Sequence, residues 1–136
     1  MIETYLDRAK SNLKAAKYNI KSKSDDEFFL NLSGYLTQQS LEFALKYVLQ
    51  MYGIEYQRTH NINMLLKQLP NELAYLAEPY EFIGDTLTNW EANSRYVMNY
   101  FLERKKIVKV ISIVECTITQ IVNLRLDNQV KQTEEF

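Results

Sequence analysis

The chain has 136 residues, 46% of them hydrophobic and 24% charged, which is enough for one soluble domain with a buried core. Its 3 glycines and 2 prolines are too few for an all-β fold built from many tight turns. The net charge of -1 indicates neither a strongly basic nor a strongly acidic protein, and the single cysteine, Cys116, excludes an internal disulfide and a cysteine-based zinc site within one chain.

The first predicted helix runs from Met1 to about Ser22, because apolar residues recur there at steps of three and four. A second row at the same steps is basic and comprises Lys10, Lys14, Lys17 and Lys21. The ordinary interpretation of such a row is a solvated helix face. The alternative is an edge that contacts the phosphates of RNA or of a nucleotide, and the first three lysines are secondary candidates for that role.

A long central helix is predicted between Ser24 and Gly53. Ser24 and Glu27 have the spacing of a capping box, and Gly53 stands where a left-handed stop is expected. Apolar residues cover more than half of the circumference, so this helix should contact neighbours on several sides. Glu42 and Lys46 are four residues apart and are expected to form a pair on the helix surface.

A short helix is predicted from Asn61 to Leu69, capped by Thr59 or Asn61 and ended by Pro70. His60, the only histidine, stands just before it. Its charge changes near neutral pH, which would suit a catalytic or metal-binding role. Because the sequence offers no second ligand, a structural hydrogen-bonding residue is the favoured interpretation, and His60 is retained as a secondary candidate for ligand binding.

Residues 71–93 are predicted to form two short helical pieces, or one helix with a kink at Pro79. Residues 94–102 have no helical period and are dense in aromatic side chains. Arginine beside tyrosines is typical of a surface that stacks on bases and binds phosphate. The alternative is an aromatic loop that covers the core, with Arg95 capping a helix end or pairing with a carboxylate.

The last predicted helix runs from Glu103 to about Val130, because this β-branched stretch is too long for a strand and keeps steps of three and four. It opens with the basic residues Arg104, Lys105, Lys106 and Lys109. We therefore predict an all-α fold, an antiparallel up-and-down bundle of four to five helices. Residues 1–130 form its single domain, and residues 131–136 form a polar tail.

Taken in order, these elements resemble the HEPN domain family over nearly the full length of the chain. The resemblance rests on a first helix like that at residues 5–16, the sequence Gln-Gln-Ser-Leu-Glu-Phe-Ala-Leu-Lys at residues 38–46, a glycine near Gly53, the Thr59-His60 pair and the Arg95-Tyr96 pair.

The resemblance implies a bundle that commonly dimerises and is often paired with a minimal nucleotidyltransferase in toxin–antitoxin modules. Catalytic relatives are metal-independent RNases with an arginine followed four to six residues later by a histidine. Here no histidine follows Arg95 in that range, and Tyr100 stands near its place. The pKa of tyrosine, ordinarily about 10, makes it a poor base for a reaction that is best served near 7. The sequence therefore predicts binding without efficient cleavage.

The favoured hypothesis is a homodimeric HEPN binding module that recognises a nucleotide, RNA or a nucleotidyltransferase through Arg95, Tyr96, Asn99 and Tyr100. A second hypothesis is a metal-independent RNase toxin of a toxin–antitoxin pair, for which Arg95 and Tyr100 are the candidate catalytic residues. The third is a helical interaction protein whose polar residues are all structural.

Neither a metal nor a cofactor is expected, and DNA is not an expected partner. The N-terminus shows no signal-peptide pattern, and no uninterrupted apolar run approaches the ~18 residues that span a bilayer. The sequence therefore predicts a cytoplasmic protein that does not bind membrane.

Overall fold

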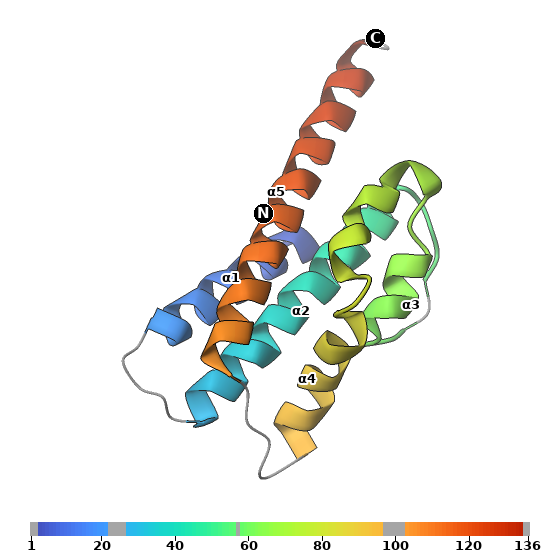
Figure 1. Cartoon of the computed structure of the whole chain (residues 1–136). Helices are drawn as coiled ribbons and strands as arrows, with labels where there is room; N and C mark the ends of the chain where they lie inside the picture. The colour runs from blue at the N-terminus through green and yellow to red at the C-terminus, as the bar shows by residue number, and fades with distance from the viewer. Residues whose placement is uncertain (1–2, 22–26, 57, 97–102, 135–136) are drawn as a thin grey trace.

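The computed structural model describes residues 3–21, 27–56, 58–96 and 103–134, and at residues 27, 91–96 and 128–134 it describes the backbone alone (Figure 1). This part of the chain is helical and contains no strand, so the predicted all-α class is confirmed. Its α-helices are α1 (Tyr5–Lys21), α2 (Glu27–Met51), α3 (Ile62–Lys67), α4 (Gly84–Tyr96) and α5 (Arg104–Glu134), and its 3₁₀ segments are η1 (Asn71–Leu76) and η2 (Glu78–Tyr80).

The first helix begins at Tyr5, whereas the apolar period predicted a start at Met1. Thr4 Oγ1 accepts the Asp7 N–H at 3.1 Å, and the Thr4 N–H donates to the Asp7 carboxylate at 3.0 Å. These reciprocal bonds are a capping box at a position where the sequence had not predicted a helix start. They hold the pKa of Asp7 below its ordinary value, so the cap is complete while Asp7 is ionised and weakens when acid protonates it.

The central helix, α2, ends where the sequence predicted. Gly53 has a φ of 68°, in the left-handed region. The Gly53 N–H donates to the Gln50 carbonyl at 3.0 Å, and the Ile54 N–H donates to the Leu49 carbonyl at 2.8 Å. This pair of bonds is a Schellman motif, which satisfies carbonyls at the helix end. The predicted cap at Ser24 lies outside the described residues.

Small residues let α1 and α2 pack closely side by side. The Ser40 hydroxyl donates to the Ala9 carbonyl at 2.6 Å, and the Ser33 hydroxyl donates to the Ala16 carbonyl at 3.1 Å. Later residues of α1 thus face earlier residues of α2, so the two helices are antiparallel. Both alanines and both serines are buried.

The middle of the chain follows the prediction in outline but not at every boundary. The Asn61 side chain caps α3 by accepting the Met64 N–H at 3.2 Å. Two short 3₁₀ pieces follow, with Pro79 in the first turn of η2, which confirms the prediction of a break there. Residues 94–96 showed no helical period in the sequence, yet they form the last turn of α4 as described, since no glycine or proline interrupts the helix before Tyr96. Residues 97–102 lie outside the described part.

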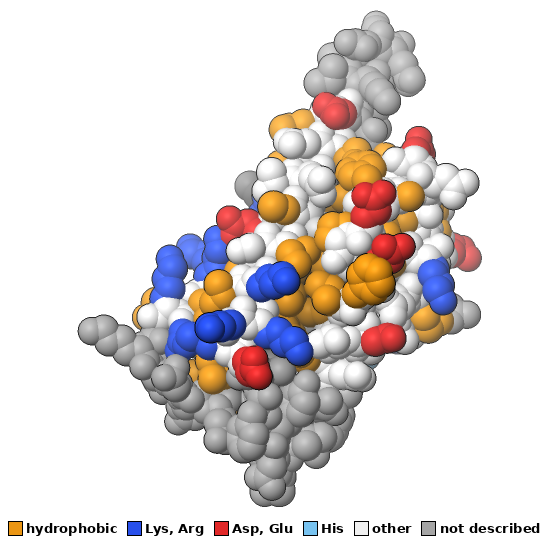
Figure 2. All heavy atoms as spheres, viewed as in Figure 1, with side chains coloured by type: hydrophobic (Ala, Val, Ile, Leu, Met, Phe, Trp, Pro, Cys, Tyr) orange, Lys and Arg blue, Asp and Glu red, His pale blue; other side chains and the backbone are white. Residues whose placement is uncertain are grey.

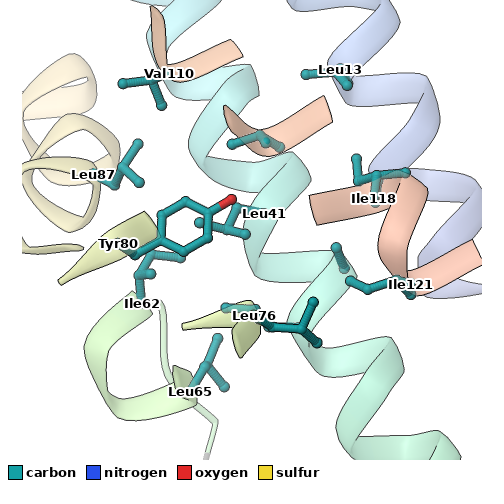
Figure 3. Close-up of a cluster of buried hydrophobic side chains, with 14 of the residues drawn as sticks. Leu13, Leu41, Ile62, Leu65, Leu76, Tyr80, Leu87, Val110, Ile118 and Ile121 are labelled. Carbon is teal, nitrogen blue, oxygen red and sulfur yellow. The ribbon is translucent and has the colours of Figure 1, made fainter. Parts of the chain in front are cut away.

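The last helix, α5, continues past the boundary predicted at Val130 to Glu134. It supplies a buried apolar row to the core. Figure 3 shows apolar side chains from every helix and 3₁₀ segment meeting in one cluster that includes Leu13, Leu41, Ile62, Leu65, Leu76, Tyr80, Leu87, Val110, Ile118 and Ile121. The Tyr80 hydroxyl lies 2.5 Å from Thr117 Oγ1, and burial raises the pKa of Tyr80 well above its ordinary value, so this polar contact stays uncharged.

Within the described residues, Arg104–Asp127 of α5 is long and apolar enough to cross a membrane, with a mean hydropathy of 1.6 in its most apolar stretch. The stretch contains charged residues, so it is not one uninterrupted apolar run. A core helix of a soluble protein meets the same criterion, and α5 places Ile107, Val114 and Ile121 in the core with no exposed side-chain area.

Replacing Gly53 with alanine should lower the free energy of unfolding by about 1 kcal/mol, because an L-residue disfavours the left-handed conformation. A Cβ atom here would meet no atom within 4 Å, so the cost comes from the backbone alone. Gly53→Asn should cost less, since asparagine tolerates this region better. Urea denaturation measures both variants, and an alanine variant as stable as the parent would contradict the assignment.

Candidate functional site

The lysine row of α1 lies on the surface. Lys10, Lys14 and Lys21 are exposed and Lys17 is half-buried. Tyr18 stands among them with 80% of its surface exposed. It is four residues after Lys14 and three before Lys21, so the three side chains share one helix face. An aromatic ring between cations is a combination that can stack on a base and hold its phosphates.

The structure places a second basic row beside the first. The Arg104 guanidinium donates to the Ile20 carbonyl, and the Lys17 ammonium pairs with the Glu115 carboxylate. These contacts join the C-terminal half of α1 to the N-terminal half of α5. Figure 2 shows Lys and Arg side chains gathered over this region. We call this surface the basic face, and it comprises Lys10, Lys14, Lys17, Lys21, Arg104, Lys105, Lys106 and Lys109.

The primary candidates from the sequence are only partly described. Arg95 and Tyr96 are the last two residues of α4, where the backbone alone is described, and Asn99 and Tyr100 lie outside the described residues. In Figure 1 the C-terminal ends of α1 and α4 and the N-terminal end of α5 lie at the same end of the bundle. The backbone of Arg95 is therefore at the same end of the molecule as the basic face.

A second polar cluster lies on the other side of α2 and contains a buried carboxylate. The Glu42 side chain is only 2% exposed. Its Oε2 lies 3.1 Å from Lys46 Nζ, and its Oε1 lies 3.0 Å from His60 Nδ1 and 3.2 Å from Gln38 Nε2. The predicted Glu42–Lys46 pair is confirmed, but its placement on the helix surface was wrong. Both oxygens of the buried charge have donors, as burial requires.

Two further hydrogen bonds hold the segment that carries His60. Gln38 Nε2 also donates to the His60 carbonyl at 3.3 Å, and the Ile62 N–H donates to Thr88 Oγ1 on α4 at 3.0 Å. The His60 side chain itself is 61% exposed. The sequence marked His60 and Glu42 separately, but nothing in their spacing could show that a loop brings them together. In the described residues no group of three or more His, Cys, Asp or Glu could hold a metal ion.

The sequence model of the HEPN domain family matches residues 2–124 of the chain. This range takes in the basic face, the cluster around Glu42 and the end of α4. No curated protein and no solved structure matches the chain.

Glu42→Ala should lower the free energy of unfolding by about 2 kcal/mol, because it removes the acceptor for the buried Gln38, the largely buried Lys46 and the exposed His60. Glu115→Ala is the matched control, since it removes an ion pair whose side chains are 41% and 48% exposed. That control should change stability by less than about 1 kcal/mol. Urea denaturation of both variants tests the contrast, and equal losses would argue against the buried cluster.

Proposed function

The chain belongs to the HEPN domain family, and from this premise we propose that it is a binding module that recognises RNA or a nucleotide through its phosphates. Family membership supports a nucleotide-related, RNA-related or toxin–antitoxin module at a coarse level. The observation that carries the finer proposal is the basic face, with Tyr18 exposed among its cations.

The charge of the basic face is local, because the whole chain has a net charge of -1. Two helices side by side present eight cationic side chains, of which Lys17 is paired with Glu115 and Arg104 is partly engaged by the Ile20 carbonyl. The exposed lysines that remain are suited to successive phosphates of a polynucleotide rather than to one compact anion. RNA is therefore the ligand that fits this surface best.

We infer that Arg95, Tyr96, Asn99 and Tyr100 extend this binding surface beyond the end of α4. Arginine supplies bidentate contacts to phosphate, and tyrosine rings can stack on unpaired bases. Because tyrosine is a poor proton acceptor near neutral pH, we propose that this segment contributes binding and not efficient cleavage.

We further propose that the module is a cytoplasmic homodimer that pairs with a nucleotidyltransferase. The support is the family to which the chain belongs, together with an exposed apolar side chain on the described surface, Phe82, which is 93% exposed. Light scattering of the purified protein, alone and mixed with a nucleotidyltransferase encoded beside it, tests both associations.

The RNase toxin remains the second candidate function, and one observation favours it. A metal-independent RNase needs a proton acceptor, and the carboxylate of Glu42 holds the exposed His60 on the same chain. Growth arrest on expression that disappears in Arg95→Ala would support this function.

Removing two cations from the basic face should weaken RNA binding and its dependence on salt. For Lys14→Gln/Lys109→Gln we expect the slope of log K against log salt to become shallower by about 1.4, because each lost contact to single-stranded RNA releases ~0.7 fewer counterions. Fluorescence anisotropy with a labelled single-stranded RNA measures the slope. Lys67→Gln, at an exposed position on α3, is the control and should leave it unchanged.

Arg95→Ala should weaken RNA binding about tenfold, because a charge-assisted contact to phosphate contributes about 1.5 kcal/mol. Tyr100→Phe keeps the aromatic ring and should preserve binding if stacking is its role. The same anisotropy assay measures both. If neither Arg95→Ala nor Tyr100→Ala changes any ligand or partner contact, the interpretation of these residues as purely structural gains over the binding module.

A further inference from the structure

Tyr18, which stands among the cations of the basic face, is not used by the core. It is 80% exposed, and the side chains that α1 buries are Leu6, Ala9, Leu13, Ala16 and Ile20. A tyrosine stabilises a fold mainly through the apolar area of its ring that is removed from water, and an exposed ring contributes little of that free energy. Tyr18 can therefore be replaced without unfolding the bundle.

The direction of Tyr18 on α1 places it at the outer edge of the basic face. At about 100° per residue, the ring projects about 40° from Lys14 and about 60° from Lys21 around the helix axis. Lys17, which pairs with Glu115 of α5, is about 100° away in the same sense. Lys14 and Lys21, both exposed, thus lie between the ring and α5.

Lys14 and Lys21 also flank Tyr18 along the helix axis. Lys14 comes four residues before the tyrosine and Lys21 three residues after it, which puts the two lysines about 10 Å apart with the ring between them. Successive phosphates of one stacked strand are ~3.4 Å apart along its axis, so this distance spans about three nucleotides. A base on the ring therefore has phosphates on either side of it that a lysine can hold.

The charge around Tyr18 distinguishes it from other exposed rings. A single exposed apolar side chain is ordinary on a protein surface. Phe82 is even more exposed, at 93%, but its neighbours at positions 78, 81 and 85 are all acidic and would repel a phosphate. At Tyr18 the neighbours on the same helix face are cations, so the ring and the charges suit the same ligand.

We propose that Tyr18 makes the basic face selective for unpaired RNA, by stacking on one base while Lys14 and Lys21 hold the phosphates on either side of it. In an A-form duplex the bases are paired and stacked on each other, so a protein meets mainly phosphates and 2′-hydroxyls. The lysines contact the phosphates of either form, whereas the ring finds a stacking partner only in an unpaired base. This inference rests on the proposed RNA-binding function and names the form of RNA that this surface takes.

Fluorescence anisotropy of the full chain with a labelled single-stranded RNA, and with the same strand annealed to its complement, tests the selectivity. We expect the parent to bind the single strand about tenfold more tightly than the duplex, which is within the range that one stacked base contributes. Tyr18→Ala should lose about tenfold in affinity for the single strand and less than about twofold for the duplex. Tyr18→Phe keeps the ring and should bind both forms as the parent does.

Two control variants separate stacking from charge and from the loss of any exposed ring. Lys14→Gln should weaken the binding of both forms, and for the single strand the slope of log K against log salt should become shallower by about 0.7. Tyr75→Ala removes a tyrosine that is 40% exposed on η1, outside the basic face, and should leave both affinities unchanged.

Tyr18→Trp gives a direct optical readout of the stack. The single tryptophan of the parent, Trp90, is only 1% exposed, so an indole at position 18 is the one that a ligand can reach. Single-stranded RNA should quench the emission that this variant adds to that of the parent, and duplex RNA should not.

The outcomes separate this inference from the proposed function. If the parent binds both forms equally well, if Tyr18→Ala weakens both by the same factor or neither, or if duplex RNA quenches Tyr18→Trp as strongly as the single strand does, the role of Tyr18 is overturned and RNA binding stands. If the parent binds neither form, the proposed function and this inference are overturned together.

Discussion

The close contact between α1 and α2 is the constraint on which the rest of the bundle depends. Two serine hydroxyls of α2 reach carbonyl oxygens of α1, Ser40 to Ala9 and Ser33 to Ala16. Both pairs are seven residues apart on each helix, so they lie two turns apart along one seam. A short side chain such as serine reaches a carbonyl of the neighbouring helix only when the two backbones come close, which alanine permits on the other side. The seam therefore sets the separation and the register of the two helices together.

With α1 seated on one side of α2, the other elements occupy the space that remains. α5 packs against both helices, while α3 and α4 pack on α2 and on each other. This arrangement brings the N-terminal half of α5 to the C-terminal half of α1, with Lys17 paired to Glu115. Two rows of cations that are more than 80 residues apart in sequence thus form one surface on a chain of nearly neutral net charge. Such a concentration of like charge opposes folding slightly and favours an anionic partner.

The cluster around Glu42 is a polar feature of a different kind. Here the charge is buried, and its desolvation is offset by donors from Lys46, Gln38 and His60. The His60 side chain is 61% exposed although its Nδ1 lies 3.0 Å from Glu42, so the cluster extends from the buried carboxylate to the surface at that residue.

The sequence by itself determined the elements and the family. Apolar steps of three and four mark α1, α2 and α5, and Gly53 and Asn61 mark one helix end and one helix start, because these signals act within a few residues. The sequence has no period of its own at Ser94–Tyr96, and there only the structure shows that α4 continues to Tyr96. Only the tertiary structure decided that Glu42 is buried beside His60 and that α5 lies along the lysine row of α1. Those contacts join residues that are distant in the chain. Which residues meet depends on how whole helices pack, and the spacing of residues within one helix does not reveal how that helix packs on another.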